Sequence, residues 1–207
     1  MSHTVITIAR QYGSGGKTVG KMLAEDLGIH FYDREIIRLA SDESGISEQL
    51  FGAADEAPKS GILGRIAKKV YTGEVLPPDS DDFVSTDNLF NYQAKIIKQI
   101  AEEESCVIIG RCADFVLREH ENVLSIFIQA PLADRVARIS EKYLIEIPTE
   151  AKKEVLRNDK LRRSYYQFYT DSKWGGREHK DLVINSSVLG IDGTVDFIKD
   201  FIERKFK

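Results

Sequence analysis

The sequence has little cysteine, tryptophan or proline: two, one and five residues respectively among 207. It also has no apolar stretch approaching the length of about 20 residues that a bilayer-spanning helix needs, which argues against a membrane partner. The two cysteines lie in or beside an apolar run, and no signal peptide precedes the first expected strand. We therefore expect a soluble, cytoplasmic protein in a reducing compartment.

Positive charge is not in excess either. The formal net charge is −4 and the sequence pI is about 5.7. The molecule as a whole therefore does not attract a nucleic acid polymer, and any affinity for polyphosphates must be local. Internal repeats and low-complexity tracts are also absent from the sequence. The length suits one α/β domain with a substantial core, although it does not determine the oligomeric state.

Apolar runs alternate with segments whose apolar residues recur every three or four positions. This alternation predicts a three-layer, mostly parallel α/β domain. Beyond a first strand that starts at Val5, we expect strands at residues 29–33, 106–110, 123–128 and 181–185. Residues 41–88 carry a weaker signal, with short amphipathic pieces and a loop by composition at 76–82, and we interpret them as an inserted, mobile segment.

The most informative segment is residues 5–18, a buried strand that runs into a glycine-rich turn and then opens a helix. In such a turn the backbone amides converge on an anion, a lysine reaches the outer phosphates, and a hydroxyl can hold magnesium. The motif G-x-x-x-x-G-K-[ST] would place its first glycine at position 11, where this chain has Gln11. The alternative is a tight strand-to-helix turn with a solvated lysine. The expected phosphate-binding residues are Gly13, Ser14, Gly15, Gly16, Lys17 and Thr18.

Polar residues follow the expected strands at the sheet edge where parallel α/β proteins bind their ligands. The second strand ends at Asp33, the third is followed by Arg111, and the last ends at Asn185. A guanidinium directly after a buried strand is well placed to clamp a phosphate with two hydrogen bonds. The alternative for Arg111 is a structural ion pair with Asp114 or Asp33.

A basic helix is expected at residues 149–169, and it ends in an aromatic-rich turn at 165–169. Arg162 and Arg163 directly precede this turn, and Asp159 can pair with either of them at helical spacing. A basic arm with glycines beyond it suits a lid that closes over transferring phosphates, although such a run is often only a solvated helix face. The tyrosines are expected to pack at the base of the lid rather than to stack on nucleobases.

The chain as a whole resembles the cytidylate kinase-like family of P-loop nucleoside monophosphate kinases, from residue 5 to about residue 200. The resemblance rests on Ile6-Thr7-Ile8, Tyr12-Gly13-Ser14-Gly15-Gly16, Phe31-Tyr32-Asp33, Val107-Ile108-Ile109-Gly110-Arg111, Asp159 with Arg162 and Arg163, and Asp181-Leu182-Val183-Ile184-Asn185-Ser186. It implies a single P-loop NTPase-like domain over residues 1–207, with a helical monophosphate-binding insertion at 41–88 and a lid at 145–176.

The same resemblance implies ATP and Mg²⁺ as cofactors and small-molecule nucleotides as partners. Arg111 would hold the acceptor phosphate, Arg162 and Arg163 would be the catalytic lid arginines, and Asp33 would lie near the metal and the acceptor. The chain departs from the family pattern at Cys112, where cytidylate kinases carry an aspartate that Asp114 would replace, and at Asn185, where they carry an acceptor-contacting aspartate. These departures leave the acceptor open.

The leading hypothesis is ATP-dependent phosphoryl transfer to a nucleoside monophosphate, with a cytidylate-like acceptor. In it, Lys17 is catalytic and contacts the β- and γ-phosphates, and Thr18 and Asp33 hold the metal. Asp33, Arg111, Asp114 and Asn185 would bind the acceptor. Two alternatives remain, namely a catalytically weak nucleotide-binding regulatory module and a kinase of another small phosphorylated metabolite. The sequence does not separate the latter from the leading hypothesis.

Overall fold

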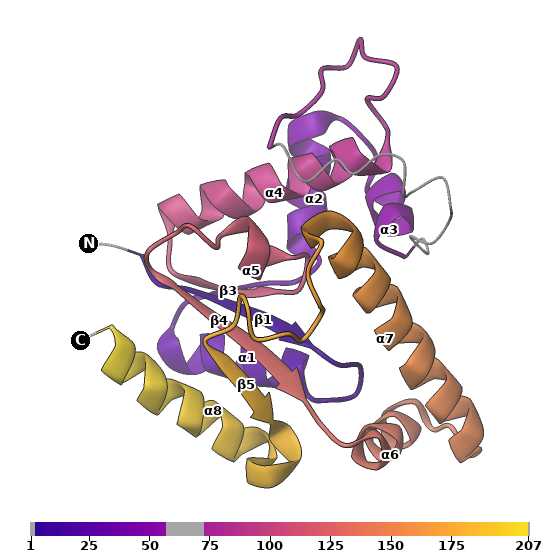
Figure 1. The fold of residues 1–207 in the computed structure, drawn as a ribbon, viewed down its shortest axis with the longest axis vertical. Coiled ribbons are helices and arrows are strands. Elements are labelled where there is room, and N and C mark those ends of the chain that lie inside the picture. Colours follow the sequence, from indigo (N-terminus) through magenta and orange to yellow (C-terminus); the bar gives the residue numbers. More distant parts are fainter. Residues whose placement is uncertain (1–2, 57–72, 207) are drawn as a thin grey trace.

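The computed structural model describes residues 3–56 and 73–206, so part of the expected insertion, residues 57–72, lies outside the described residues. Within the described residues five strands pair in parallel in the order β2-β3-β1-β4-β5 (Figure 1). The strands are β1 (Val5–Arg10), β2 (His30–Tyr32), β3 (Cys106–Ile109), β4 (Val123–Gln129) and β5 (Leu182–Asn185). The expected mostly parallel sheet is confirmed.

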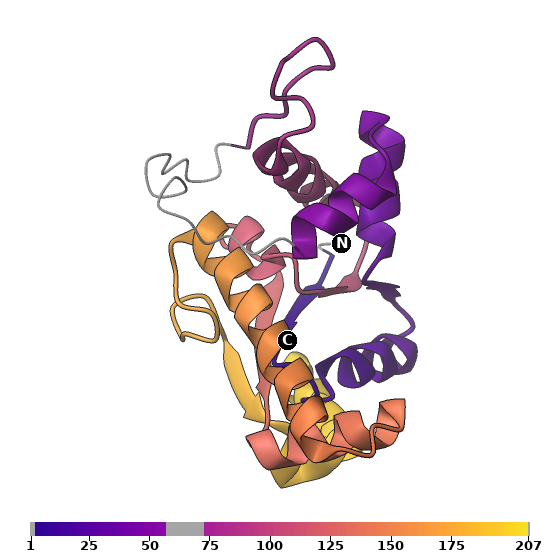
Figure 2. The ribbon, with the colours of Figure 1, turned by 90° about the vertical axis from the view of Figure 1, so that its right-hand side faces the viewer.

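Helices cover both faces of the sheet, which confirms the three layers (Figures 1 and 2). One apolar cluster joins alternate residues of β1, β3 and β4 to α1 (Gly16–Leu27) and α8 (Ser186–Lys205). A second cluster joins the opposite face to α2 (Glu35–Ser44), α3 (Glu48–Glu56), α4 (Thr86–Glu103), α5 (Ala113–Val116) and the end of α7 (Pro148–Thr170). The strands are therefore buried on both sides, as their continuous apolar sequences predict.

A third, smaller apolar cluster lies between α6 (Leu132–Tyr143) and the first half of α7. It contains Ile139, Ala151 and Val155. These two helices lie beside the glycine-rich loop, because Arg135 of α6 and Asp159 of α7 bond to the backbone of Tyr12. None of the helices in the described ranges is long and apolar enough to cross a membrane.

The chain after β2 contains more helix than its sequence indicates. It continues as α2 to Ser44 and then as α3, which the weak signal after residue 41 concealed. The expected irregular stretch at residues 76–82 is confirmed, and the buried Asn88 side chain ties it to α4 through hydrogen bonds with Leu76 and Phe83. The helix α5 was not expected, because its four residues are too few to show a period.

The helix expected at residues 149–169 is confirmed as α7, and its aromatic-rich segment at 165–169 forms the last turns of this helix rather than a separate turn. Their rings pack against α4. Phe90 stacks on Tyr169 with 3.9 Å between ring centroids and meets Tyr165 edge-on at 6.1 Å. This burial keeps the segment helical up to Thr170, and Asp171 ends the helix with a φ of 52°. The expected packing of the tyrosines is therefore seen, and it is against α4.

Candidate functional site

The glycine-rich loop connects β1 to α1, and its backbone requires glycine at Gly13 and Gly15. Their φ values are 77° and 81°, in the left-handed region that L side chains rarely adopt. A Cβ on Gly15 would also lie 2.3 Å from Ile191 Cδ1. At the start of α1, no hydrogen bond within the described residues is donated by the amides of Gly15, Gly16 and Lys17. A helix N-terminus with such amides binds anions.

Side-chain donors from α6 and α8 bind the backbone carbonyls of the loop. Three successive carbonyl groups each accept one side-chain hydrogen bond. The pairs are Arg135 Nη1 to Tyr12 O (3.1 Å), Arg138 Nη1 to Gly13 O (3.4 Å) and Ser186 Oγ to Ser14 O (2.7 Å). The acceptors are thus used inside the protein, whereas the amides of Gly15, Gly16 and Lys17 donate to no described residue.

Gln11 occupies the position at which the motif has its first glycine, and the structure gives it a role. Its side-chain Oε1 accepts a hydrogen bond from the Ala130 amide at 3.1 Å, which ties the loop to the end of β4. Its carbonyl accepts the Ser14 hydroxyl at 2.9 Å. The side chain of Ser14 is therefore buried in the loop itself, and its amide and carbonyl are also in use, bonded to Gln11 and Ser186.

Asp159 does not pair with Arg162 or Arg163 as expected. Its carboxylate forms a buried ion pair with Arg135 at 2.5 Å and accepts the Tyr12 amide at 2.8 Å. Both partners come from distant segments, so spacing along α7 carried no signal for them. Asp159 thereby supports the glycine-rich loop.

Beside the loop lies a cavity of about 400 Å³, between the ends of β1 and β3 and the second half of α7. Arg111, Arg162, Asp33 and Asp114 line it as the sequence predicts, whereas Arg163 and Asn185 are not among the residues that line it. Sequence reasoning missed further lining residues at segment ends, among them Arg10 and Arg34. The position of Arg10 as the last residue of the first strand was the available signal.

Asp33 lies between the loop and the cavity. Its carboxylate forms an ion pair with Lys17, with 2.6 Å between Lys17 Nζ and Asp33 Oδ2. Burial raises the pKa of Asp33, but the Lys17 hydrogen bond and the charges of Arg10, Lys17 and Arg111 outweigh it and hold that pKa below its usual value. Asp33 is therefore ionised at neutral pH. Lys17 and Thr18 are exposed at the start of α1.

Arg111 is held by a strained turn. Gly110, Arg111 and Cys112 have φ values of 73°, 55° and 54°, and the Ala113 amide bonds to the Gly110 carbonyl at 3.0 Å. Left-handed backbone at two residues that are not glycine is costly and is concentrated at functional sites. The Arg111 guanidinium donates to the Asp33 carbonyl at 3.1 Å and to Gln93 Oε1 at 2.6 Å. The turn and these contacts together direct Arg111 along the cavity wall.

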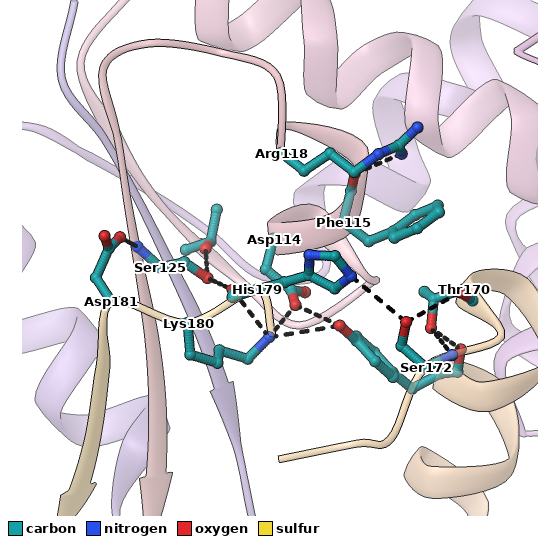
Figure 3. Close-up of polar contacts among 11 residues, drawn as sticks. Asp114, Phe115, Arg118, Ser125, Thr170, Ser172, His179, Lys180 and Asp181 are labelled. Atoms are coloured by element: carbon teal, nitrogen blue, oxygen red, sulfur yellow. Dashed lines mark hydrogen bonds and ion pairs between the residues drawn. The ribbon is translucent and has the colours of Figure 1, made fainter. Parts of the chain in front are cut away.

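Asp114 lies in the wall of the cavity, but Oδ2 of its carboxylate is already in use (Figure 3). It accepts the Tyr166 hydroxyl at 2.7 Å and forms an ion pair with Lys180. Lys180 and Asp114 side chains are 1% and 3% exposed. Burial, followed by the charge of Asp114, raises the pKa of Tyr166 well above its usual value, so its hydroxyl stays a donor. Asp114 thus joins α5, α7 and the segment before β5.

Loss of one partner of this buried pair should destabilise the protein strongly. We expect Lys180→Met to lower the free energy of unfolding by about 3–5 kcal/mol, because it leaves the Asp114 charge buried without its ion-pair partner. The double variant Lys180→Met with Asp114→Asn removes both charges and should recover much of this loss. Urea denaturation of both variants measures the difference. Equal stability of the two variants would contradict the assignment.

The second half of α7 brings Arg162 to the cavity. Its Nη1 donates to the Arg10 carbonyl at 3.1 Å, and its guanidinium lies 5.3 Å from the Tyr12 ring centroid. Burial lowers the pKa of Arg162, although not enough to discharge a guanidinium. The adjacent Arg163 points to solvent. Asn185 caps α8, since its side chain accepts the Ser187 amide at 3.0 Å.

Comparisons with known proteins show the family of the chain. The model of the cytidylate kinase-like family matches residues 5–188. The cytidylate kinase of Methanococcus aeolicus is 27% identical, over 98% of this chain and 99% of that protein. The cytidylate kinase of Archaeoglobus fulgidus is 26% identical, over 97% and 95%.

Solved structures give the same picture of the fold. An uncharacterized protein from Eubacterium ventriosum superposes with a TM-score of 0.70 at 27% identity, covering 97% of this chain and 99% of that one. A shikimate kinase from Bacteroides thetaiotaomicron superposes with a TM-score of 0.53 at 13% identity, covering 97% and 98%. At that identity the second likeness concerns the fold alone.

Proposed function

This chain belongs to the cytidylate kinase-like family, and we propose that it transfers the γ-phosphoryl group of ATP to a nucleoside monophosphate. A cytidylate-like nucleotide is the leading candidate for the acceptor. The observation that carries the proposal is the junction of two sites. A loop of anion-binding amides at the start of α1 adjoins a cavity lined by arginines at the ends of β1, β3 and α7. Donor and acceptor phosphates would meet where the two join.

On the donor side, the amides of Gly13, Gly15, Gly16 and Lys17 would hold the β- and γ-phosphates. Lys17 would exchange its ion pair with Asp33 for contacts with these phosphates, since its side chain is 61% exposed and free to turn. Such transfer needs little covalent help from the protein, so positioning and neutralisation of charge provide most of the catalysis.

Mg²⁺ fits the residues present at this place. Within the described ranges no cluster of three His, Cys, Asp or Glu side chains forms a closed metal site. Magnesium in kinases does not need one, because it is held by one or two protein oxygens together with nucleotide phosphates and water. The exposed hydroxyl of Thr18 and the ionised carboxylate of Asp33 would supply those oxygens. When bound, the ion would neutralise charge on the phosphates.

On the acceptor side, Arg111 would bind the phosphate of the monophosphate, and Arg162 would approach the transferred group from α7. The bond between the γ-phosphorus and the β–γ bridging oxygen breaks, and its electron pair leaves with ADP. An oxygen of the acceptor phosphate forms the new bond. Residues 145–176 would act as the lid and residues 41–88 as the acceptor-binding insertion, of which 57–72 lie outside the described residues.

A thermal-shift series tests the function directly. MgATP and a panel of nucleoside monophosphates are added separately to the protein. A ligand present at 100 times its dissociation constant adds about 2.7 kcal/mol to the free energy of unfolding. We expect MgATP and at least one monophosphate to stabilise the protein, followed by transfer when both are present. Stabilisation by MgATP without transfer to any monophosphate would favour the regulatory module instead.

The two sides of the site should be separable by mutation. Arg111→Ala should raise the KM for the acceptor by at least tenfold and leave the affinity for ATP within about threefold, because Arg111 follows β3 and contacts Asp33 and Gln93 rather than the loop. A loss of tenfold corresponds to about 1.4 kcal/mol. Calorimetric titration with ATP alone gives the control value. A large loss of ATP affinity would place Arg111 on the donor side.

A further inference from the structure

Arg10 connects the two halves of the proposed site. It is the last residue of β1, a strand that lies between β3 and β4, and it pairs with Ile128 of β4. The side chain lies between the first residue of α1 and the turn that carries Arg111. It also lines the cavity that holds Asp33 and Arg162.

Two glycines make room for this side chain, one at each end. A Cβ on Gly16 would lie 2.6 Å from Arg10 Cβ, so the aliphatic stem of Arg10 lies against the start of α1. A Cβ on Gly110 would lie 2.1 Å from Arg10 Nη1 and 3.3 Å from Cζ, so the guanidinium lies directly on the Gly110 backbone. Any other residue at either position would displace Arg10.

The electrostatics converge on the same place. The charges of Arg10, Lys17 and Arg111 all act on the Asp33 carboxylate and lower its pKa. Lys17 belongs to the donor loop and Arg111 to the acceptor turn, and Arg10 lies between them. The field of these three cations therefore stabilises negative charge at the junction of the two halves. In phosphoryl transfer, charge is spread over the oxygens of the group in transit.

A third contact ties Arg10 to the lid helix. Its carbonyl accepts the hydrogen bond from Arg162 Nη1 at 3.1 Å. The described lining of the cavity contains four arginines, Arg10, Arg34, Arg111 and Arg162, against two carboxylates, those of Asp33 and Asp114. Both carboxylates are ion-paired with lysines. The cavity thus favours an anionic group. Among these four arginines, Arg10 is the nearest to the glycine-rich loop along the chain.

Resting on the proposed function, we propose that Arg10 is a further catalytic residue, which contacts the phosphoryl group while it passes from donor to acceptor. Its contacts with the two phosphates in the ground state are weaker, because Lys17 and the loop amides hold the donor and Arg111 the acceptor. A group that binds the transition state more tightly than the ground state raises kcat rather than affinity. Arg10 would act in cis in the manner of an arginine finger.

The test compares Arg10→Met and Arg10→Lys with the control Arg204→Met, an exposed arginine on α8. We expect Arg10→Met to lower kcat about 10²-fold, the effect of removing one donor to developing charge. The KM values for ATP and acceptor should stay within threefold. Arg10→Lys should recover only part of kcat, since an ammonium lacks the planar fork of the guanidinium. A kcat for Arg10→Met within threefold of the control overturns the proposal.

A binding measurement makes the test independent of turnover. ADP with Mg²⁺, alone and with aluminium fluoride as a mimic of the transferring group, is titrated while the fluorescence of Trp174 is followed. Trp174 is the one tryptophan of the chain and lines the cavity. We expect Arg10→Met to weaken binding of the mimic at least tenfold and of ADP less than threefold. Equal losses for both ligands overturn the proposal.

Two possible outcomes still leave the role of Arg10 testable. If the wild-type protein transfers phosphoryl groups to no acceptor, the proposed function fails, yet the difference between ADP and the mimic still decides the role of Arg10. If Arg10→Met does not fold, Arg10→Lys decides, because its stem can still lie against Gly16. A mimic-specific loss in Arg10→Lys then supports the proposal, and its absence overturns it.

Discussion

Replacing Lys17 with alanine should lower ATP-dependent phosphoryl transfer about 10³-fold while the fold stays intact. Lys17 opens α1 directly after the glycine-rich loop, where the amides of Gly15 and Gly16 donate no hydrogen bond within the described residues. Within the described residues its ion pair is with Asp33, at 2.6 Å, and its side chain is 61% exposed. The charges of Arg10 and Arg111 still act on the Asp33 carboxylate in this variant, so the free energy of unfolding should change little.

Lys21→Ala is the matched control for this variant. Lys21 lies one turn further along the same helix, is 65% exposed, and pairs only with Glu25 within the described residues, at 3.5 Å. It should retain turnover, because it cannot reach a phosphate at the helix start. Initial rates at saturating ATP and acceptor, with thermal unfolding of both variants, provide the comparison. Turnover of Lys17→Ala within threefold of Lys21→Ala would show that the loop does not hold the donor.

The second large effect is expected at Arg162, and the structure separates it from its neighbour. We expect Arg162→Ala to lower kcat about 10³-fold, the lower limit for a catalytic arginine in phosphoryl transfer. Arg162 lines the cavity and bonds to the Arg10 carbonyl, whereas Arg163 points to solvent. Arg163→Ala should therefore lower kcat less than tenfold.

The dissociation constant of ATP and kcat together distinguish the possible reasons for a loss of activity in Arg162→Ala. If Arg162 acts on the transferred group, the dissociation constant of ATP should stay within about threefold while kcat falls. Arg162→Lys should recover only part of the rate, because a point charge does not reproduce the bidentate grip of a guanidinium. Rate losses of similar size for Arg162→Ala and Arg163→Ala would mean that α7 contributes through its overall charge and not through one side chain.

The ion pair of Asp159 on α7 differs from the one that helical spacing predicts. Helical spacing predicted that Asp159 can pair with Arg162 or Arg163. A buried carboxylate, however, needs an ion-pair partner and hydrogen-bond donors that are themselves within the protein interior. That partner is Arg135 of α6, together with the Tyr12 amide. Similarly, Asn185 at the end of β5 meets the start of α8, where capping an amide satisfies its side chain. Neither contact is encoded by sequence distance.

The sequence by itself determined the features that depend on a few consecutive residues. Continuous apolar runs specify strands that are buried on both faces, and glycines at fixed positions specify a loop whose backbone needs left-handed φ values, as at Gly13 and Gly15. A lysine at the first turn of the next helix then follows from the same stretch of chain. These features are local, so no knowledge of packing was needed to predict them.

Only the tertiary structure decided which side chains meet in the cavity and which support it. The tyrosine-rich end of α7 packs on Phe90, and this docking turns Arg162 toward the cavity and leaves Arg163 exposed. The fit of Arg10 between Gly16 and Gly110 joins residues far apart in the chain. The physical reason is that ion pairing, burial and steric fit act between neighbours in space. Their partners are chosen by the packing of whole helices on the sheet, which no local pattern contains.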